Sequence, residues 1–144
     1  MRLTSFTDFG LRALMRIASD PSRSFSTAEI AEEHGISRHH LTKAVAALAN
    51  AGFLVTRRGH EGGAQLAVPA EQIRLGDVVR VLEAGSALVE CFAAGNACRI
   101  SPECRLRGFL HEGEQAFLAS LDRRTLADCA LSPLEHRAGA ARSA

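Results

Sequence analysis

The sequence predicts a mainly α fold with a small β-wing, in which a winged helix-turn-helix is followed by a long C-terminal dimerisation helix. Two short helical patterns flank Gly35, and two helices around a glycine turn are typical of a helix-turn-helix. Two short β-rich runs then flank a glycine-rich turn at 57–63, as in the hairpin of a wing. A strong helix start at 101–103 precedes a long amphipathic stretch.

The first two helices have recognisable boundaries. Residues 6–19 place apolar side chains on one helical face. Thr4 or Ser5 can cap this helix, and Pro21 ends it. The second helix begins with a capping box at 26–29, a serine followed three residues later by a glutamate. It ends at the glycine turn, where a left-handed residue is needed.

The third helix, which would be the recognition helix of a helix-turn-helix, and the wing follow directly in the chain. Ser37 is placed to cap the third helix, and Gly52 ends it. Residues 53–56 and 64–68 have strand composition. Residues 75–83 predict another helix.

The chain divides into three predicted regions. Residues 1–83 form the winged helix-turn-helix DNA-binding domain, 84–132 a cysteine-rich loop with a dimerisation helix, and 133–144 a disordered tail. Proline at the first helical position and an acid in the first turn favour a helix start at Ser101. Because a winged helix closes its own core, the long helix needs another surface, and we expect a homodimer. Its apolar stripe comprises Leu106, Phe109, Leu110, Gly113, Phe117 and Leu121.

Composition sets limits on the class of protein. The 144 residues are 47% hydrophobic and carry a formal net charge of +1, so bulk charge does not argue for nucleic acid and any DNA contact must rest on local placement. No apolar run is long enough to span a membrane, and the N-terminal run lacks the features of a secretory signal. We therefore expect a cytoplasmic protein without membrane contact. Motifs for nucleotide binding or a nucleophile elbow are missing from the sequence, so we do not expect an enzyme.

Polar side chains at the start of the third helix are candidates for reading double-stranded operator DNA. The N-terminal half of such a helix enters the major groove, and arginine and lysine reach guanine edges or phosphates there. Basic residues of the wing would contact the neighbouring groove or its backbone. The alternative is that these faces are merely solvated. The candidates are Ser37, Arg38, His39, His40, Thr42 and Lys43 in the helix, and Arg57, Arg58 and His60 in the wing.

Three cysteines, Cys91, Cys98 and Cys104, lie close together after the winged helix. Structural zinc usually has close ligand pairs and four ligands, whereas these wider spacings suit a loop around an iron–sulfur cluster. Zinc binding, thiol redox sensing and a lack of function remain alternatives. We expect Cys104 at the third position of the long helix, where the helix dipole favours a thiolate. Cys129, which lies apart in an apolar run, is interpreted as an ordinary buried thiol.

Further motifs lie at residues 1–15, Gly62-Gly63-x-x-Leu66, Glu90-Cys91-Phe92, Cys98-x-Ile100-x-Pro102-x-Cys104-x-Leu106, 116–118 and 125–128. Together these motifs resemble the NsrR repressors, which belong to the same wider winged-helix family as IscR and CymR. The resemblance covers residues 1–130. It implies a dimeric transcriptional repressor with one iron–sulfur cluster per subunit, 4Fe–4S favoured over 2Fe–2S. Nitric oxide would be the effector, and nitrosylation would release the operator.

The resemblance aligns the three cysteines with the cluster ligands and leaves the fourth ligand open. The IscR branch has a histidine three residues after the last cysteine, where this chain has Arg107. In NsrR-like proteins the resemblance implies an oxygen ligand from the partner subunit, and Asp8 occupies that place. The alternative is that Asp8 pairs with Arg12 four residues later. His111 is a competing candidate ligand.

Other functions stay open at this stage. A winged-helix regulator of the same family that responds to iron–sulfur supply or redox state would use the same cysteines. A zinc-stabilised DNA-binding module without a sensing role is a further alternative.

Overall fold

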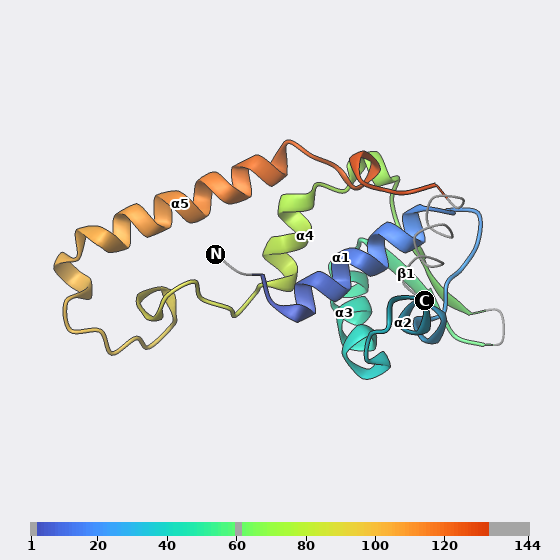
Figure 1. Cartoon of the computed structure of the whole chain (residues 1–144), viewed down its shortest axis with the longest axis horizontal. Coiled ribbons are helices and arrows are strands. Elements are labelled where there is room, and N and C mark those ends of the chain that lie inside the picture. The colour runs from blue at the N-terminus through green and yellow to red at the C-terminus, as the bar shows by residue number, and fades with distance from the viewer. Residues whose placement is uncertain (1–2, 60–61, 133–144) are drawn as a thin grey trace.

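The computed structural model describes residues 3–59 and 62–132 and confirms a mainly α fold with one small sheet (Figure 1). Four helices and the sheet pack together, whereas the fifth helix extends away from them. The predicted disordered tail, 133–144, lies outside the described residues. The elements are α1 (Ser5–Ala18), α2 (Thr27–His34), α3 (Arg38–Asn50), β1 (Leu54–Arg57), β2 (Gly63–Leu66), η1 (Ala70–Gln72), α4 (Leu75–Leu82), η2 (Glu90–Phe92), η3 (Ser101–Glu103), α5 (Arg105–Asp122) and η4 (Leu126–Asp128).

One hydrophobic core holds the winged helix together. Helices α1, α2, α3 and α4 each contribute an apolar face, and η4, which follows the C-terminal end of α5, adds Leu126. None of the helices in the described ranges has the length and apolar character needed to cross a membrane. The largest fully buried apolar side chains are Phe25, Leu14, Ile17, Ile30, Leu41, Leu48, Ile73, Leu126, Val78 and Val79.

The capping residues and the glycine turn predicted for the first helices lie at the observed helix ends. The Thr4 side chain accepts a hydrogen bond from the Thr7 N–H at 3.2 Å, which caps α1. At the start of α2 the Ser26 side chain accepts from the Glu29 N–H at 3.1 Å. This is one half of the predicted capping box, because the Glu29 side chain pairs with Arg23 instead. Gly35 adopts φ 62° between α2 and α3, a left-handed conformation that glycine takes without a steric penalty. Local sequence therefore sets the starts of α1 and α2 and the turn between α2 and α3.

The wing is attached to the helices through a contact that the sequence did not indicate. Strands β1 and β2 pair antiparallel, with Leu54 opposite Leu66. In addition, Phe25 forms an isolated bridge with Ala64 of β2. The Phe25 N–H donates to the Ala64 carbonyl at 3.0 Å, and the Ala64 N–H returns a bond of 2.8 Å. The segment between α1 and α2 thus holds the wing.

The start of the long helix differs from the prediction. Residues Ser101–Glu103 form only a 3-10 turn, and Cys104 has an extended backbone with φ −77° and ψ 106°. Cys104 is therefore the N-cap of α5 rather than the third residue of a helix begun at Ser101, and that prediction was wrong. Short-range bonds within the turn, such as Glu103 N–H to the Ile100 carbonyl at 3.2 Å, satisfy its donors locally. The chain consequently restarts its helix at Arg105.

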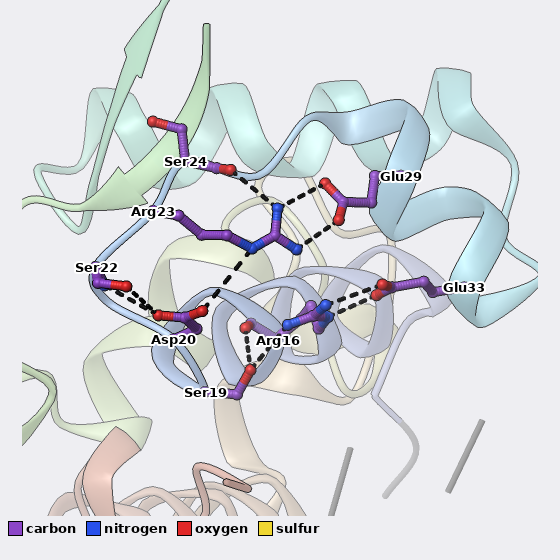
Figure 2. Close-up of polar contacts among 8 residues, drawn as sticks. All are labelled: Arg16, Ser19, Asp20, Ser22, Arg23, Ser24, Glu29 and Glu33. Atoms are coloured by element: carbon purple, nitrogen blue, oxygen red, sulfur yellow. Dashed lines mark hydrogen bonds and ion pairs between the residues drawn. The ribbon is translucent and has the colours of Figure 1, made fainter. Parts of the chain in front are cut away.

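Two arginines lie over the ring of Phe25, and both pair with glutamates of α2 (Figure 2). The Arg16 and Arg23 guanidinium carbons lie 4.4 and 3.8 Å from the ring centroid, as in cation–π contacts. Arg16 Nε donates to Glu33 Oε2 at 2.6 Å, and Arg23 donates to Glu29 Oε1 at 2.5 Å. Both glutamates belong to α2. We call these five residues the arginine clamp.

Replacing Glu33 with glutamine should lower the free energy of unfolding by about 2 kcal/mol, because a buried guanidinium loses its charged partner. The Arg16 side chain is only 9% exposed. Glu29→Gln is the matched control, since the Arg23–Glu29 pair is more exposed and should contribute less than about 1 kcal/mol. Urea denaturation measures both variants. Equal losses would show that burial of Arg16 does not set the strength of the clamp.

Candidate nucleic-acid interface and metal centre

The outward face of α3 carries the predicted DNA-reading residues. Leu41, Ala44, Val45 and Leu48 turn inward and are buried. The remaining polar side chains at the start of the helix are therefore free to meet a ligand. Those exposed are Ser37, Arg38, His39, His40, Thr42 and Lys43.

The first turn of α3 suits an anionic ligand. Ser37 holds the N-cap position, as predicted, but its side chain makes no capping hydrogen bond. The N–H groups at a helix start have no partner within the helix and attract phosphate when they are not capped. The Thr42 hydroxyl donates to the Arg38 carbonyl at 2.8 Å, so Thr42 offers DNA an acceptor more readily than a donor.

One predicted reading residue also contacts α1. The His40 ring stacks on Phe9, with ring centroids 6.4 Å apart and an interplanar angle of 27°. His39 lies beside His40 at 5.8 Å. Phe9 directly follows Asp8 in the chain. The recognition helix is therefore in contact with the helix that carries the candidate fourth ligand, a contact that no local sequence pattern signals.

The wing presents a second basic group. Arg57 ends β1, and both Arg57 and Arg58 are exposed. The remaining wing candidate, His60, lies outside the described residues. The roles of these residues in DNA binding stay predictions.

The three clustered cysteines all lie in the segment between α4 and α5 or at its end. Cys91 is in η2, Cys98 is in the following loop, and Cys104 caps α5. All four cysteines of the chain fall within the described ranges, and each is a free, half-buried thiol. Among the described residues, no three or more His, Cys, Asp or Glu side chains are gathered closely enough to hold a metal ion. Cys91, Cys98 and Cys104 thus share one segment, but their thiols are not gathered around a common point.

Cys104 borders two hollows in this segment. One, of about 490 Å³, is lined also by Arg99, Ile100, Pro102 and Glu103. The other, of about 400 Å³, includes Phe92, Arg107 and His111. The three thiols fit an iron–sulfur cluster by donor type, because soft thiolates are its usual ligands, and Cys104 is the one of them that lines these hollows.

The two candidates for a fourth ligand have different surroundings. Asp8 is half-exposed and pairs with Arg12 at 2.9 Å, the i,i+4 contact that the sequence offered as its alternative role. His111 contacts the Phe92 ring edge-on at 5.9 Å and lines the hollow beside Cys104. His111 is therefore nearer the thiol segment than its sequence distance indicated.

Cys129 has a different environment from the other thiols. It packs against the hydrophobic core, and its Sγ donates to the Leu126 carbonyl at 3.4 Å. Burial raises the pKa of the Cys129 thiol, and the nearby Asp128 carboxylate adds to the effect. A thiol with a raised pKa is a poor ligand and nucleophile at neutral pH, which agrees with its predicted structural role.

Glu83, which the sequence analysis did not single out, joins the start of α1 to the end of α4. Its carboxylate accepts hydrogen bonds from the Thr4 N–H at 2.8 Å, from the Thr4 hydroxyl at 2.9 Å and from the Thr7 hydroxyl. Burial raises the pKa of Glu83, but the bonds from Thr7, Thr4 and Ser86 outweigh it, so the pKa lies below its usual range. The residue connects the helix of Asp8 to the segment that leads into the cysteines.

Known proteins resemble this chain over nearly its whole length. The profile of the Rrf2 family, described as iron-dependent transcriptional regulators, matches residues 3–131. The oxidised form of CymR from Staphylococcus aureus is 31% identical, with a TM-score of 0.67 over 88% of this chain and 93% of that one. IscR from T. potens is 26% identical, with a TM-score of 0.70 over 89% and 85%. CymR of B. subtilis, a global cysteine regulator, is 27% identical, with a TM-score of 0.66 over 90% and 96%.

Replacing Glu83 with glutamine should destabilise the protein at pH 7 by roughly 1–2 kcal/mol, through loss of charged hydrogen bonds. Because the folded-state pKa of Glu83 is lowered, its stabilisation is complete above the unfolded pKa and disappears as pH falls through the folded value. The difference between variant and wild type should therefore shrink as the pH falls. Urea denaturation from pH 7 to pH 3 measures it, and a difference that stays constant over this range would contradict the role of the charge.

Proposed function

The chain belongs to the Rrf2 family of transcriptional regulators, and we propose from this premise that it is a dimeric, operator-binding repressor that senses nitric oxide through an iron–sulfur cluster. The observation that carries the proposal is the set of three free thiols on one segment, with Arg107 rather than histidine three residues after the last. Cys91, Cys98 and Cys104 would hold the cluster, and a fourth, weaker ligand would leave one iron open to attack. When bound, such a cluster supplies iron that reacts with nitric oxide.

DNA recognition would use the exposed face of α3 and the wing. Arg38 and Lys43 would contact base edges or phosphates in the major groove, and Arg57 and Arg58 the adjacent backbone. Two such units on a dimer would meet half-sites about one DNA turn apart. The proposed place of action is the cytoplasm, where operator DNA is accessible.

The exposed face of α5 supports the dimer. Among the described residues, α5 contributes none to the buried set. Phe109 and nearby Ile100 are each 67% exposed, and Leu106 is 59% exposed. Full burial of such a side chain contributes roughly 1.5–3 kcal/mol, so leaving three together in water is unfavourable. The same helix of a second subunit would cover them.

Asp8 is the proposed fourth ligand, supplied across the dimer. Its contact with Arg12 is a surface ion pair, and such pairs contribute about 1 kcal/mol or less, so Asp8 can leave Arg12 at little cost. A carboxylate is a hard ligand for iron held by soft thiolates, and a displaceable one. The neighbouring Phe9 stacks on His40 of α3. Release of Asp8 would therefore affect α3, the proposed recognition helix.

A second candidate function is supported by the likeness to oxidised CymR and to IscR. In this version the same thiols would report redox state or iron–sulfur supply, with operator binding unchanged in principle. The two candidates differ in the effector to which the protein responds, and a titration separates them.

Protein purified without oxygen should contain iron and acid-labile sulfide and should absorb visible light. Nitric oxide should change the spectrum and weaken binding to an operator selected from random DNA, both over the same range of added gas. Cys98→Ser should remove the spectrum, because a thiolate ligand is lost. Visible spectra and fluorescence anisotropy, read on the same samples, measure the two responses.

Arg38→Ala is the matched control for that titration. It should keep the metal and the spectral response but weaken operator binding by about 1–3 kcal/mol, as expected for loss of a base or phosphate contact. Intact protein that never takes up iron would overturn the sensing proposal and leave a plain operator-binding dimer. A spectrum that responds to oxidants but not to nitric oxide would favour the second candidate.

Asp8→Ala should retain the cluster, because an external ligand can replace the carboxylate, but should uncouple DNA binding from nitric oxide. Operator affinity would then change by less than about threefold across the titration. Arg12→Gln, which breaks the same ion pair but leaves the carboxylate, should respond as the wild type does. Gel shifts with and without nitric oxide measure both variants. An Asp8→Ala variant that also responds normally would remove Asp8 from the sensing path.

A further inference from the structure

The last residue of α5 is held on α4 by a two-point ion pair. Asp122 Oδ1 and Oδ2 each accept a hydrogen bond of 2.7 Å from the two terminal nitrogens of Arg80. A paired contact of this kind fixes the relative direction of the groups as well as their distance. The bonds from Arg80 lower the pKa of Asp122 below its usual range, so the carboxylate is charged at neutral pH.

The contact requires a glycine beneath it. A Cβ atom at Gly76, in the first turn of α4, would lie 1.9 Å from Asp122 Oδ1 and 2.8 Å from Asp122 Cγ. Any other residue would push the carboxylate away from Arg80. The Asp122 side chain therefore lies directly against the backbone of α4 at Gly76.

Backbone bonds fix the chain just after this ion pair. The Leu75 N–H donates to the Arg124 carbonyl at 3.0 Å, and the Leu126 N–H donates to the Ile73 carbonyl at 2.8 Å. Leu126 is fully buried in the core. We call this region, Gly76, Arg80 and Asp122 with the flanking backbone bonds, the α4–α5 joint.

Helix α5 runs from the α4–α5 joint away from the winged helix (Figure 1), so the geometry of the joint bears directly on its direction. A helix of 18 residues is about 27 Å long. A 10° change at one end would move the other by about 5 Å, more than the ~3.4 Å rise of one base pair. The exposed apolar residues lie at the N-terminal end of α5, away from the joint. A change in the direction of α5 would therefore alter the placement of a partner subunit that packs on them.

We propose that Arg80 and Asp122 are positioning residues that determine the half-site spacing of the operator that the dimer accepts. The inference rests on the proposed dimeric operator binding. With the joint intact, the two recognition helices keep one separation, and DNA with another spacing is bound poorly. With the joint loosened, α5 can take several directions, and the protein tolerates several spacings.

The test uses a panel of selected operators in which base pairs are added or removed between the half-sites. Wild type should lose about tenfold or more in affinity for each one-base-pair departure from its preferred spacing. Asp122→Asn should flatten this profile to about threefold or less. Gly76→Ala, which displaces the carboxylate without changing charge and favours helix formation, should give the same flattening. Fluorescence anisotropy measures every affinity.

Asp77→Asn is the matched control. Asp77 accepts a bond of 3.2 Å from the same Arg80 guanidinium but belongs to α4, so its loss leaves the contact between the helices in place and should keep the wild-type profile. Variants that lose affinity equally at every spacing, or that keep the wild-type profile, would overturn the positioning role alone. Wild-type protein that sediments as a monomer, or binds all spacings equally, would overturn the proposed dimeric recognition itself.

Discussion

The winged helix depends on the enclosure of a single aromatic ring. Phe25 lies between the guanidinium groups of Arg16 and Arg23, and its backbone pairs with β2. Because the two arginines also bind glutamates of α2 (Figure 2), one short segment connects α1, α2 and the wing. Helix α2 has only eight residues, too few for a stable isolated helix. Its position under the recognition helix therefore comes from these charged contacts together with the core.

Much of the fold could be predicted because its signals are local. The caps at Thr4 and Ser26 and the glycine turn at Gly35 depend on neighbours within a few residues, so the sequence contains the whole of the relevant chemistry. The arginine clamp and the α4–α5 joint could not be predicted in this way. Arg80 and Asp122 are 42 positions apart, and nothing near either residue distinguishes their charges from those of an ordinary solvated surface. The misplaced start of α5 shows a related limit, since a proline suited to a helix start suits a 3-10 turn equally well.

In the candidate site, too, the residues could be predicted from the sequence, whereas the contacts between them could not. The spacing of the cysteines singled out the three thiols of the segment before α5, and helical periodicity singled out the polar face of α3. The contacts that would link them are tertiary: Phe9 on His40, and Glu83 on Thr4 and Thr7. Both involve α1, which lies between the DNA-reading helix and the residues that lead into the cysteines. A regulator needs such a connecting element, because an effector can shift DNA affinity only through a difference between two states that both sites share.

The environment of Cys129 has a practical consequence for chemistry on the intact protein. Alkylating reagents attack thiolates, so the raised pKa of Cys129 makes this residue slow to be modified at neutral pH. Iodoacetamide or a maleimide dye would then report mainly on the loop between α4 and α5, without any need to engineer the background. A thiol that holds a ligand is protected from the label. Mass spectrometry of the labelled protein could therefore follow ligand binding at Cys91, Cys98 and Cys104, with Cys129 as an internal reference.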